Sequence, residues 1–237
     1  MTATHGQRKT LRDNDLSLAD VIRNFCTFTP PRLICLALVG SVTMRLRAGP
    51  LSWSDLAIFG VLVVGQPLTE WLIHVFILHA KPKKILGRTL DYHSAQMHRA
   101  HHRDPWDLRY TVMPVKSVFS GFSVVIGGAW LLLPTPAAMW TAVVTAASLA
   151  LVYEWIHFLI HTSYRPRSHW MRTLWKMHRL HHFKNEHYWF GVSRIGADTW
   201  LRTSPDPQEV PRSPTARTLG VEDEDEELAD LPSGVGR

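Results

Sequence analysis

The sequence predicts an all-α integral membrane protein: a helical bundle of about four transmembrane helices with a histidine-rich helical cap on the cytoplasmic side. Three observations support this fold class. Apolar residues make up 46% of the 237 residues and are concentrated in a few long runs. Lysine and arginine lie almost entirely in the segments between alternate runs. Twelve of the 14 histidines fall between residues 74 and 182.

The composition excludes several other classes of protein. Two cysteines are too few for a disulfide scaffold, and the apolar content is too high for a disordered chain. The net charge of +6 is uneven, because residues 220–237 hold seven acidic residues and one arginine. The remaining positive charge is what loops on the cytoplasmic side of a membrane carry, so no nucleic-acid partner is predicted.

Three segments are predicted along the chain. Residues 1–32 form a cytoplasmic N-terminal segment with an amphipathic helix over 17–29, which either lies on the membrane surface or packs on the rest of the protein. Residues 33–202 form the membrane domain. Residues 203–237 contain four prolines and then the acidic run, and they are predicted to be a disordered tail.

Each expected membrane span follows from an apolar run. The first is the weakest, because Arg45 and Arg47 would have to extend to the far interface. Of the 26 lysines and arginines, 24 fall on one side of a four-span arrangement, which places both termini and both long loops in the cytoplasm. A three-span protein without the first run would put the basic N-terminus outside. The expected spans are 33–46, 56–79, 118–133 and 137–161.

The histidines form four groups with regular spacing. Two pairs lie near the ends of the second and fourth spans, and each of the loops that follow carries a His-x-x-His-His group. Each half of the protein thus contributes five histidines, preceded by a Glu-Trp pair. The groups are His74 and His79; His98, His101 and His102; His157 and His161; and His178, His181 and His182.

Helix geometry indicates that these ten imidazoles converge. Positions i, i+3 and i+4 share a helix face, so each His-x-x-His-His group is expected to aim three rings at one point. His74 and His79 would lie about 140° apart on an ideal helix, so His79 either lies past the helix end or the helix is distorted there. Because two spans separate the halves, both reach the same membrane face. The sequence predicts two metal ions at the centre of a pseudo-twofold arrangement.

Glu70 and Glu154 precede the two histidine pairs at membrane depth, where a lone carboxylate is costly. They are predicted to accept hydrogen bonds from the N–H groups of the ligand rings, with helix capping or bridging as the alternative. Of the other histidines, only His187 lies close enough to a cluster to line the site. Imidazole suits zinc, copper, iron and nickel, but a catalytic zinc uses three protein ligands and would leave most of the ten unexplained.

The four histidine groups, in order, resemble those of the fatty acid hydroxylase superfamily of membrane di-iron oxygenases, which includes sterol desaturases. The resemblance covers roughly residues 66–202 and rests on EWLIHVFILH, HRAHHRDPWDLRYTVMP, YEWIHFLIH and HRLHHFKNEHYWFGVS. It implies O2 activation and oxidation of a lipid C–H bond, giving an alcohol or, in some relatives, a double bond. It also implies that two iron ions are held by His74, His79, His98, His101, His102, His157, His161, His178, His181 and His182.

The resemblance implies partners as well. Asp107, together with the two glutamates, is expected to balance the charge of the metal ions, although a simple ion pair with Arg109 is the alternative. The substrates are a membrane lipid, such as a fatty acyl chain or a sterol, and O2. A 32-residue N-terminal segment cannot hold a fused haem carrier, so a separate electron donor protein is expected, and a bacterial inner membrane is favoured over the endoplasmic reticulum. A histidine-rich metal transporter is less favoured, because the central parts of the spans lack ionisable residues.

Overall fold

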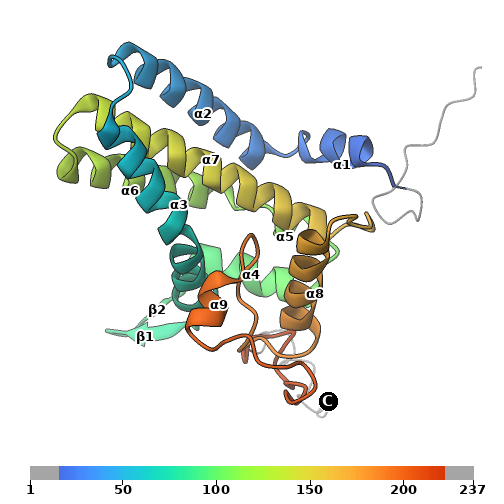
Figure 1. Cartoon of the computed structure of the whole chain (residues 1–237). Coiled ribbons are helices and arrows are strands. Elements are labelled where there is room, and N and C mark those ends of the chain that lie inside the picture. The colour runs from blue at the N-terminus through green and yellow to red at the C-terminus, as the bar shows by residue number, and fades with distance from the viewer. Residues whose placement is uncertain (1–15, 222–237) are drawn as a thin grey trace, which may run out of the picture.

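A computed structural model of the protein describes residues 16–221 and confirms a mostly helical architecture (Figure 1). His5 and the acidic run lie outside the described residues. The elements, in chain order, are α1 (Leu18–Phe25), α2 (Thr29–Arg47), α3 (Trp53–Ile73), the π-helix η1 (His74–Leu78), β1 (Lys83–Ile85), β2 (Arg88–Leu90), α4 (His93–Arg103), α5 (Leu108–Thr111), α6 (Val115–Leu132), α7 (Pro136–Ile160), α8 (His169–Phe183) and α9 (Gly196–Trp200).

Three helical stretches are long and apolar enough to cross a membrane: Trp53–Leu78, Leu108–Leu132 and Pro136–Ile160. A fourth is possible if α1 and α2, which meet at a bend of 82°, count as one broken span. The predicted membrane bundle of about four helices is therefore confirmed at three to four. In Figure 1 these long helices form one layer, and α4, α8 and α9 lie together at one end of it.

Helix α7 is the centre of the bundle. It packs against α2, α3 and α6, and half of its most apolar window is buried, against 11% for each of the other two stretches. Its buried positions include Ala138, Ala142 and Ala147. Small side chains let helix backbones approach closely within a membrane, where packing rather than hydrophobicity drives association.

Helix α1 packs on the C-terminal end of α7, which is one of the two alternatives that the sequence left open. Val21 and Phe25 are buried, and the Phe25 ring lies 5.3 Å from the rings of both Trp155 and Phe158, edge to face. A capping box between Ser17 and Asp20 starts the helix. The N-terminal helix thereby supports the end of α7 that carries two of the histidines.

Arg45 lies near the turn between α2 and α3, where its side chain is held by protein groups rather than by solvent. The side chain is buried and pairs with Asp55 of α3, with 2.7 Å between Nη2 and Oδ2. Its Nε donates to Thr141 of α7 at 2.7 Å, and its Nη1 donates to the carbonyl of Gly49 at 2.8 Å. One guanidinium thus joins three helices and a loop at the end of the bundle away from the histidines, which offsets the cost of burying its charge.

Arg45→Lys is therefore expected to lower the free energy of unfolding by about 1–2 kcal/mol, because an ammonium cannot reach these acceptors together. Thermal unfolding of the detergent-purified protein measures the change. Arg47→Lys is the matched control, since Arg47 lies on the same helix and is exposed. Equal stability of the two variants would contradict this role for Arg45.

A short antiparallel hairpin, β1–β2, connects η1 to α4 and is an addition to the predicted all-helical fold. Its turn places Leu86 at φ 49° and Gly87 at φ 75°. Two consecutive positive φ values are typical of the tight turns that match the twist of a hairpin. The hairpin takes up part of the distance between the first two histidine groups.

The prediction of a disordered tail over residues 203–237 is wrong for residues 203–221, which we call the C-terminal strap. The strap has no helix or strand, but Val210, Ala216 and Leu219 are buried. Its backbone is tied to the end of α8, where the Ser213 amide donates to the Lys184 carbonyl at 2.7 Å. In Figure 1 the strap is the orange-red chain beside α8 and α9. The polar composition of the strap gave no sign of an ordered structure, because hydrogen bonds contribute to holding it in place.

Candidate metal centre

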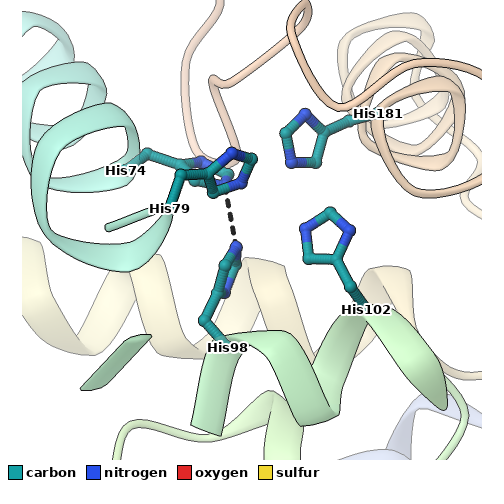
Figure 2. A group of neighbouring side chains, drawn as sticks. All are labelled: His74, His79, His98, His102 and His181. Atoms are coloured by element: carbon teal, nitrogen blue, oxygen red, sulfur yellow. Dashed lines mark hydrogen bonds between the residues drawn. The ribbon is translucent and has the colours of Figure 1, made fainter. Parts of the chain in front are cut away.

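The ten predicted histidines meet where η1, α4, α8 and the end of α7 converge, and all except His79 are buried. They form two groups of five, and within each group the candidate ligand nitrogens lie within 4.8 Å of one another. The first group, drawn in Figure 2, is His74, His79, His98, His102 and His181. The second group is His101, His157, His161, His178 and His182.

A π-helical turn brings His74 and His79 together. The His79 amide donates to the His74 carbonyl at 3.0 Å, an i to i+5 bond that closes η1. Because a π turn is wider than an α turn, residues five apart come onto nearly the same face. His79 is also the C-terminal cap of this element. The sequence offered two explanations for the pair, a distorted helix or a helix end, and the structure has both. Figure 2 shows the two rings side by side.

Each His-x-x-His-His group divides between the two sites, which corrects the prediction that its three rings aim at one point. On α4, His98 and His102 belong to the first group, and His101 belongs to the second. On α8, the i and i+4 rings enter the second group, and His181 enters the first. The cause is helical: positions i+3 and i+4 lie about 100° apart, on opposite sides of position i. The middle histidine of each His-x-x-His-His group, His101 or His181, therefore joins the site formed mainly by the other half.

The nitrogen separations are those of ligands around an ion. His178 Nε2 lies 3.1 Å from His157 Nε2 and 3.0 Å from His161 Nε2. In the first group, His74 Nε2 lies 3.1 Å from His98 Nε2. Two donors that bind one ion at about 2.1 Å and at right angles lie about 3 Å apart. A neutral ring has only one N–H, so His178 Nε2 cannot be hydrogen-bonded to several rings at once.

Several of the ring nitrogens have no hydrogen-bond partner among the residues that the structure describes. They include Nε2 of His79, His102 and His181 and both nitrogens of His101. Such buried polar atoms are costly unless something binds them. Burial lowers the pKa of His102 to about 3 and holds the pKa of His178 well below its ordinary value, so these rings are neutral near pH 7. Neutral imidazoles with free lone pairs are the form that binds a metal ion.

Backbone carbonyls orient the rings from behind. His74 Nδ1 donates to the Phe190 carbonyl at 2.6 Å, and His157 Nδ1 donates to the Thr111 carbonyl at 2.8 Å. His181 Nδ1 donates to the Tyr188 carbonyl at 2.8 Å. A ring that donates through Nδ1 has its lone pair on Nε2, which is the atom turned toward the other rings. The structure therefore fixes the tautomer in both groups.

Glu70 and Glu154 support these carbonyls rather than the rings themselves, which corrects the predicted direct contact with ligand N–H groups. Glu70 Oε1 accepts from the amides of Val192, by a short hydrogen bond, and Ser193, at 2.8 Å. Glu154 Oε1 accepts from the Met113 amide at 3.0 Å. Each glutamate thus holds a segment two or three residues after the carbonyl that orients the histidine of its own helix. Both glutamates therefore have the alternative role that the sequence offered, bridging between segments of the chain.

The buried glutamate of each half binds a backbone segment of the other half. Glu70 belongs to the first half but holds residues 190–193, which follow the second His-x-x-His-His group. Glu154 belongs to the second half but holds residues 111–113, which follow the first. The pseudo-twofold relation inferred from the sequence therefore extends beyond the ligands to the buried carboxylates, and each site depends on both halves.

Asp107 and Arg109 form the local pair that was the alternative role for Asp107. The carboxylate accepts from the Arg109 amide at 3.0 Å and pairs with its guanidinium at 2.6 Å. Asp107 caps α5, whose last residue supplies the Thr111 carbonyl. His187 does not line the site, because its side chain is 70% exposed and faces Glu186 at 3.4 Å. His93 and His169 are exposed as well.

Asp198 is a supporting residue that the sequence reasoning missed. It accepts from the amides of Phe190, at 3.0 Å, and Gly191, at 2.6 Å. This fixes the turn whose carbonyl orients His74. A side chain at Gly191 would place its Cβ 2.2 Å from the Arg194 carbonyl, so only glycine fits there. One signal was available: Glu186 and Asp198 are the only acidic residues between positions 155 and 203.

The sequence around these histidines matches that of a known protein family. The sequence model of the fatty acid hydroxylase family matches residues 59–203, more than half of the chain. The chain belongs to the fatty acid hydroxylase family. All ten clustered histidines, and the carboxylates that support them, lie inside the matched segment.

Individual relatives agree with this family. The fatty acid 2-hydroxylase of Macaca fascicularis is 32% identical over 129 residues, which are 53% of this chain and 33% of that protein. The Rattus norvegicus protein of the same name is 28% identical over 152 residues, 61% of this chain and 39% of that protein. The chain thus spans between a third and two fifths of these relatives.

The fold also has a solved counterpart. The structure of full-length scs7p, in which only the hydroxylase domain is visible, superposes with a TM-score of 0.62. It covers 77% of this chain and 67% of that one at 24% identity. At this identity the likeness shows the fold alone, and the fold agrees with the family that the sequence shows.

Proposed function

We propose that this protein is a membrane di-iron oxygenase that hydroxylates a C–H bond of a lipid, with O2 and with electrons from a separate donor protein. The observation that carries the proposal is the convergence of ten imidazoles into two adjoining groups of five. The donor set fits metal ions, because its nitrogens lie 3.0–3.1 Å apart and several have no other partner in the described chain.

Family membership favours iron over the other metals that imidazole binds. When bound, two irons would supply the activation of O2 that insertion of an oxygen atom into a C–H bond requires. The ten histidines would hold the ions, and the carbonyls of Thr111, Tyr188 and Phe190 keep the rings in the tautomer that binds them. Burial of the rings would keep water away from the ions that they hold.

The position of the site supports a lipid substrate. Histidines of both groups lie at the C-terminal ends of two helices that are apolar enough to cross a membrane. A lipid can reach this position from the bilayer without entering water. Relatives named fatty acid 2-hydroxylase favour an acyl chain over a sterol-like substrate. The predicted orientation, with the histidines and both termini in the cytoplasm, and a bacterial inner membrane remain part of the proposal.

Lipid extracts test the function. Cells that express the protein are compared with cells that lack it, by mass spectrometry. Hydroxylation adds one oxygen atom to a lipid, whereas desaturation, the alternative in the same family, removes two hydrogen atoms. No change of either kind, together with metal uptake by vesicles that contain the protein, would favour the metal transporter instead.

An apolar groove on α8 with basic side chains around it is the surface that we propose for docking of the electron donor. A cavity of about 430 Å³ on the outer face of the helix is lined by residues that include Trp175, Lys176, Arg179 and Arg212. The Arg179 guanidinium lies 3.8 Å from the Trp175 ring centroid, over its face. Arg179 directly follows the candidate ligand His178 in the sequence. The positive charge of Arg179, next to a candidate ligand in the sequence, is suited to binding an acidic electron donor protein.

Reversing the charge of this groove with Lys176→Glu and Arg212→Glu is expected to raise the KM for the donor several-fold, with kcat at saturating donor unchanged. The salt dependence of the rate should weaken as well, because exposed charges steer association. Steady-state turnover with a purified donor measures both. Lys83→Glu, in the exposed hairpin, is the control. An unchanged KM, with weaker binding to anionic vesicles, would show that the groove contacts lipid instead.

A further inference from the structure

The C-terminal strap reaches the metal centre. His102 Nδ1 donates to the carbonyl of Ala216 at 2.8 Å, across more than a hundred residues of sequence. Ala216 is buried, and both His102 and its carbonyl partner are removed from solvent. The family match ends at residue 203, so Ala216 lies outside it. The strap therefore supplies to a candidate ligand what the Thr111 and Phe190 carbonyls supply from within the family domain.

The strap is fastened directly after the last histidine helix. Three consecutive residues there bind it: the Lys184 carbonyl accepts from Ser213, the Asn185 amide group donates to the Pro211 carbonyl at 3.2 Å, and Glu186 accepts a short hydrogen bond from the Thr215 hydroxyl. Glu186 is only 2% exposed. Thr215 directly precedes Ala216, so the Glu186–Thr215 bond fixes the position of the carbonyl that holds His102.

The strap makes the two metal sites unequal. His182 is the counterpart of His102 in the other half, since each is the last histidine of its group. His102 Nδ1 has the Ala216 carbonyl, whereas His182 Nδ1 has no hydrogen-bond partner within the described residues. A fixed tautomer and ring orientation strengthen a histidine ligand. This difference breaks the pseudo-twofold symmetry at one position.

We propose that the C-terminal strap is a positioning element for the first histidine group, and that Glu186 and Thr215 hold it so that the Ala216 carbonyl orients His102 toward the metal ion. The inference rests on the proposed metal centre. It predicts that loosening the strap weakens one metal site and leaves the other unchanged, since no residue of the second group is bound by the Ala216 carbonyl.

Thr215→Val tests the proposal, because it removes the hydroxyl and keeps the shape of the side chain. The metal-free protein is titrated with Fe(II) against a competing chelator, without O2. Wild type is expected to bind two ions per chain. In Thr215→Val, the affinity of one ion should fall several-fold, up to about 10-fold, because the variant loosens the strap rather than removing the partner of His102 itself. The other ion should bind as in wild type.

Two further variants keep the test decisive. Thr215→Ser restores the hydroxyl and should restore both affinities, and Thr218→Val makes the same substitution elsewhere on the strap as a control. Glu186→Gln keeps an acceptor for Thr215, so its Fe(II) affinity at the first group should lie between those of wild type and Thr215→Val. This variant replaces Thr215→Val in the test if the valine variant does not fold. The proposal would be overturned if folded Thr215→Val bound both ions with wild-type affinity. It would also be overturned if the affinity fell equally at both sites. Absence of metal binding by wild type would instead refute the proposed function.

Discussion

His178→Ala is expected to lower product formation more than about 100-fold. Its Nε2 lies 3.0–3.1 Å from the Nε2 atoms of His157, His161 and His182, so it is at the centre of the second group. Loss of a supporting hydrogen bond to a ligand already costs about 10–100-fold in affinity or activity, and loss of the ligand itself should cost more. Mass spectrometry of the oxidised lipid measures the effect, and metal analysis of the purified variant shows whether an ion is lost.

His169→Ala is the matched control for this prediction. His169 lies on the same helix but is exposed, and it belongs to neither group. The control should form product at the wild-type rate. If His178→Ala retained O2-dependent turnover, the second group would not be part of the reaction centre.

Glu70→Ala is expected to lower the free energy of unfolding by about 3 kcal/mol or more. The carboxylate accepts from two backbone amides and the hydroxyl of Ser193, all of them buried. Each buried donor left without a partner costs about 1–3 kcal/mol. Val192 and Ser193 would lose their anchor, while Asp198 would still hold the amides of Phe190 and Gly191. The segment that carries the Phe190 carbonyl would be held at one end only, so the affinity of the first group for its ion should fall as well.

Ser193→Ala separates this effect from general damage to the fold. It removes one of the donors and leaves the carboxylate bound to the backbone, so a loss of about 1 kcal/mol is expected. Thermal unfolding of the two variants in detergent, with metal analysis, makes the comparison. Equal stability of Glu70→Ala and Ser193→Ala would show that the carboxylate does not hold this segment.

Spacing along the sequence was enough to predict which histidines come together and which helices bear them. Five histidines in each half, with two spans between, can meet on only one membrane face, and the structure brings all ten together. Spacing did not predict how the rings divide. On α4, His101 and His102 are neighbours in sequence but point to different sites, because one residue turns a helix by about 100°.

The supporting residues were hidden for a different reason. Carbonyls such as those of Thr111, Phe190 and Ala216 are present at every residue, so no side chain marks them in the sequence. Carboxylates at membrane depth were recognisable as important, but their partners were backbone amides rather than rings. The strap was missed because its segment is rich in proline and polar residues, a composition shared by disordered tails.

Metal analysis combined with Mössbauer spectroscopy tests the metal centre most directly. Metal-free protein is purified in detergent, loaded with ⁵⁷Fe(II) without O2 and separated from free metal. Two irons per chain, both with nitrogen ligation, are predicted, and replacing His74 or His157 by alanine should each remove an ion from a different group. Less than one iron per chain in folded wild-type protein, or iron binding that survives replacement of all ten histidines, would contradict a di-iron centre.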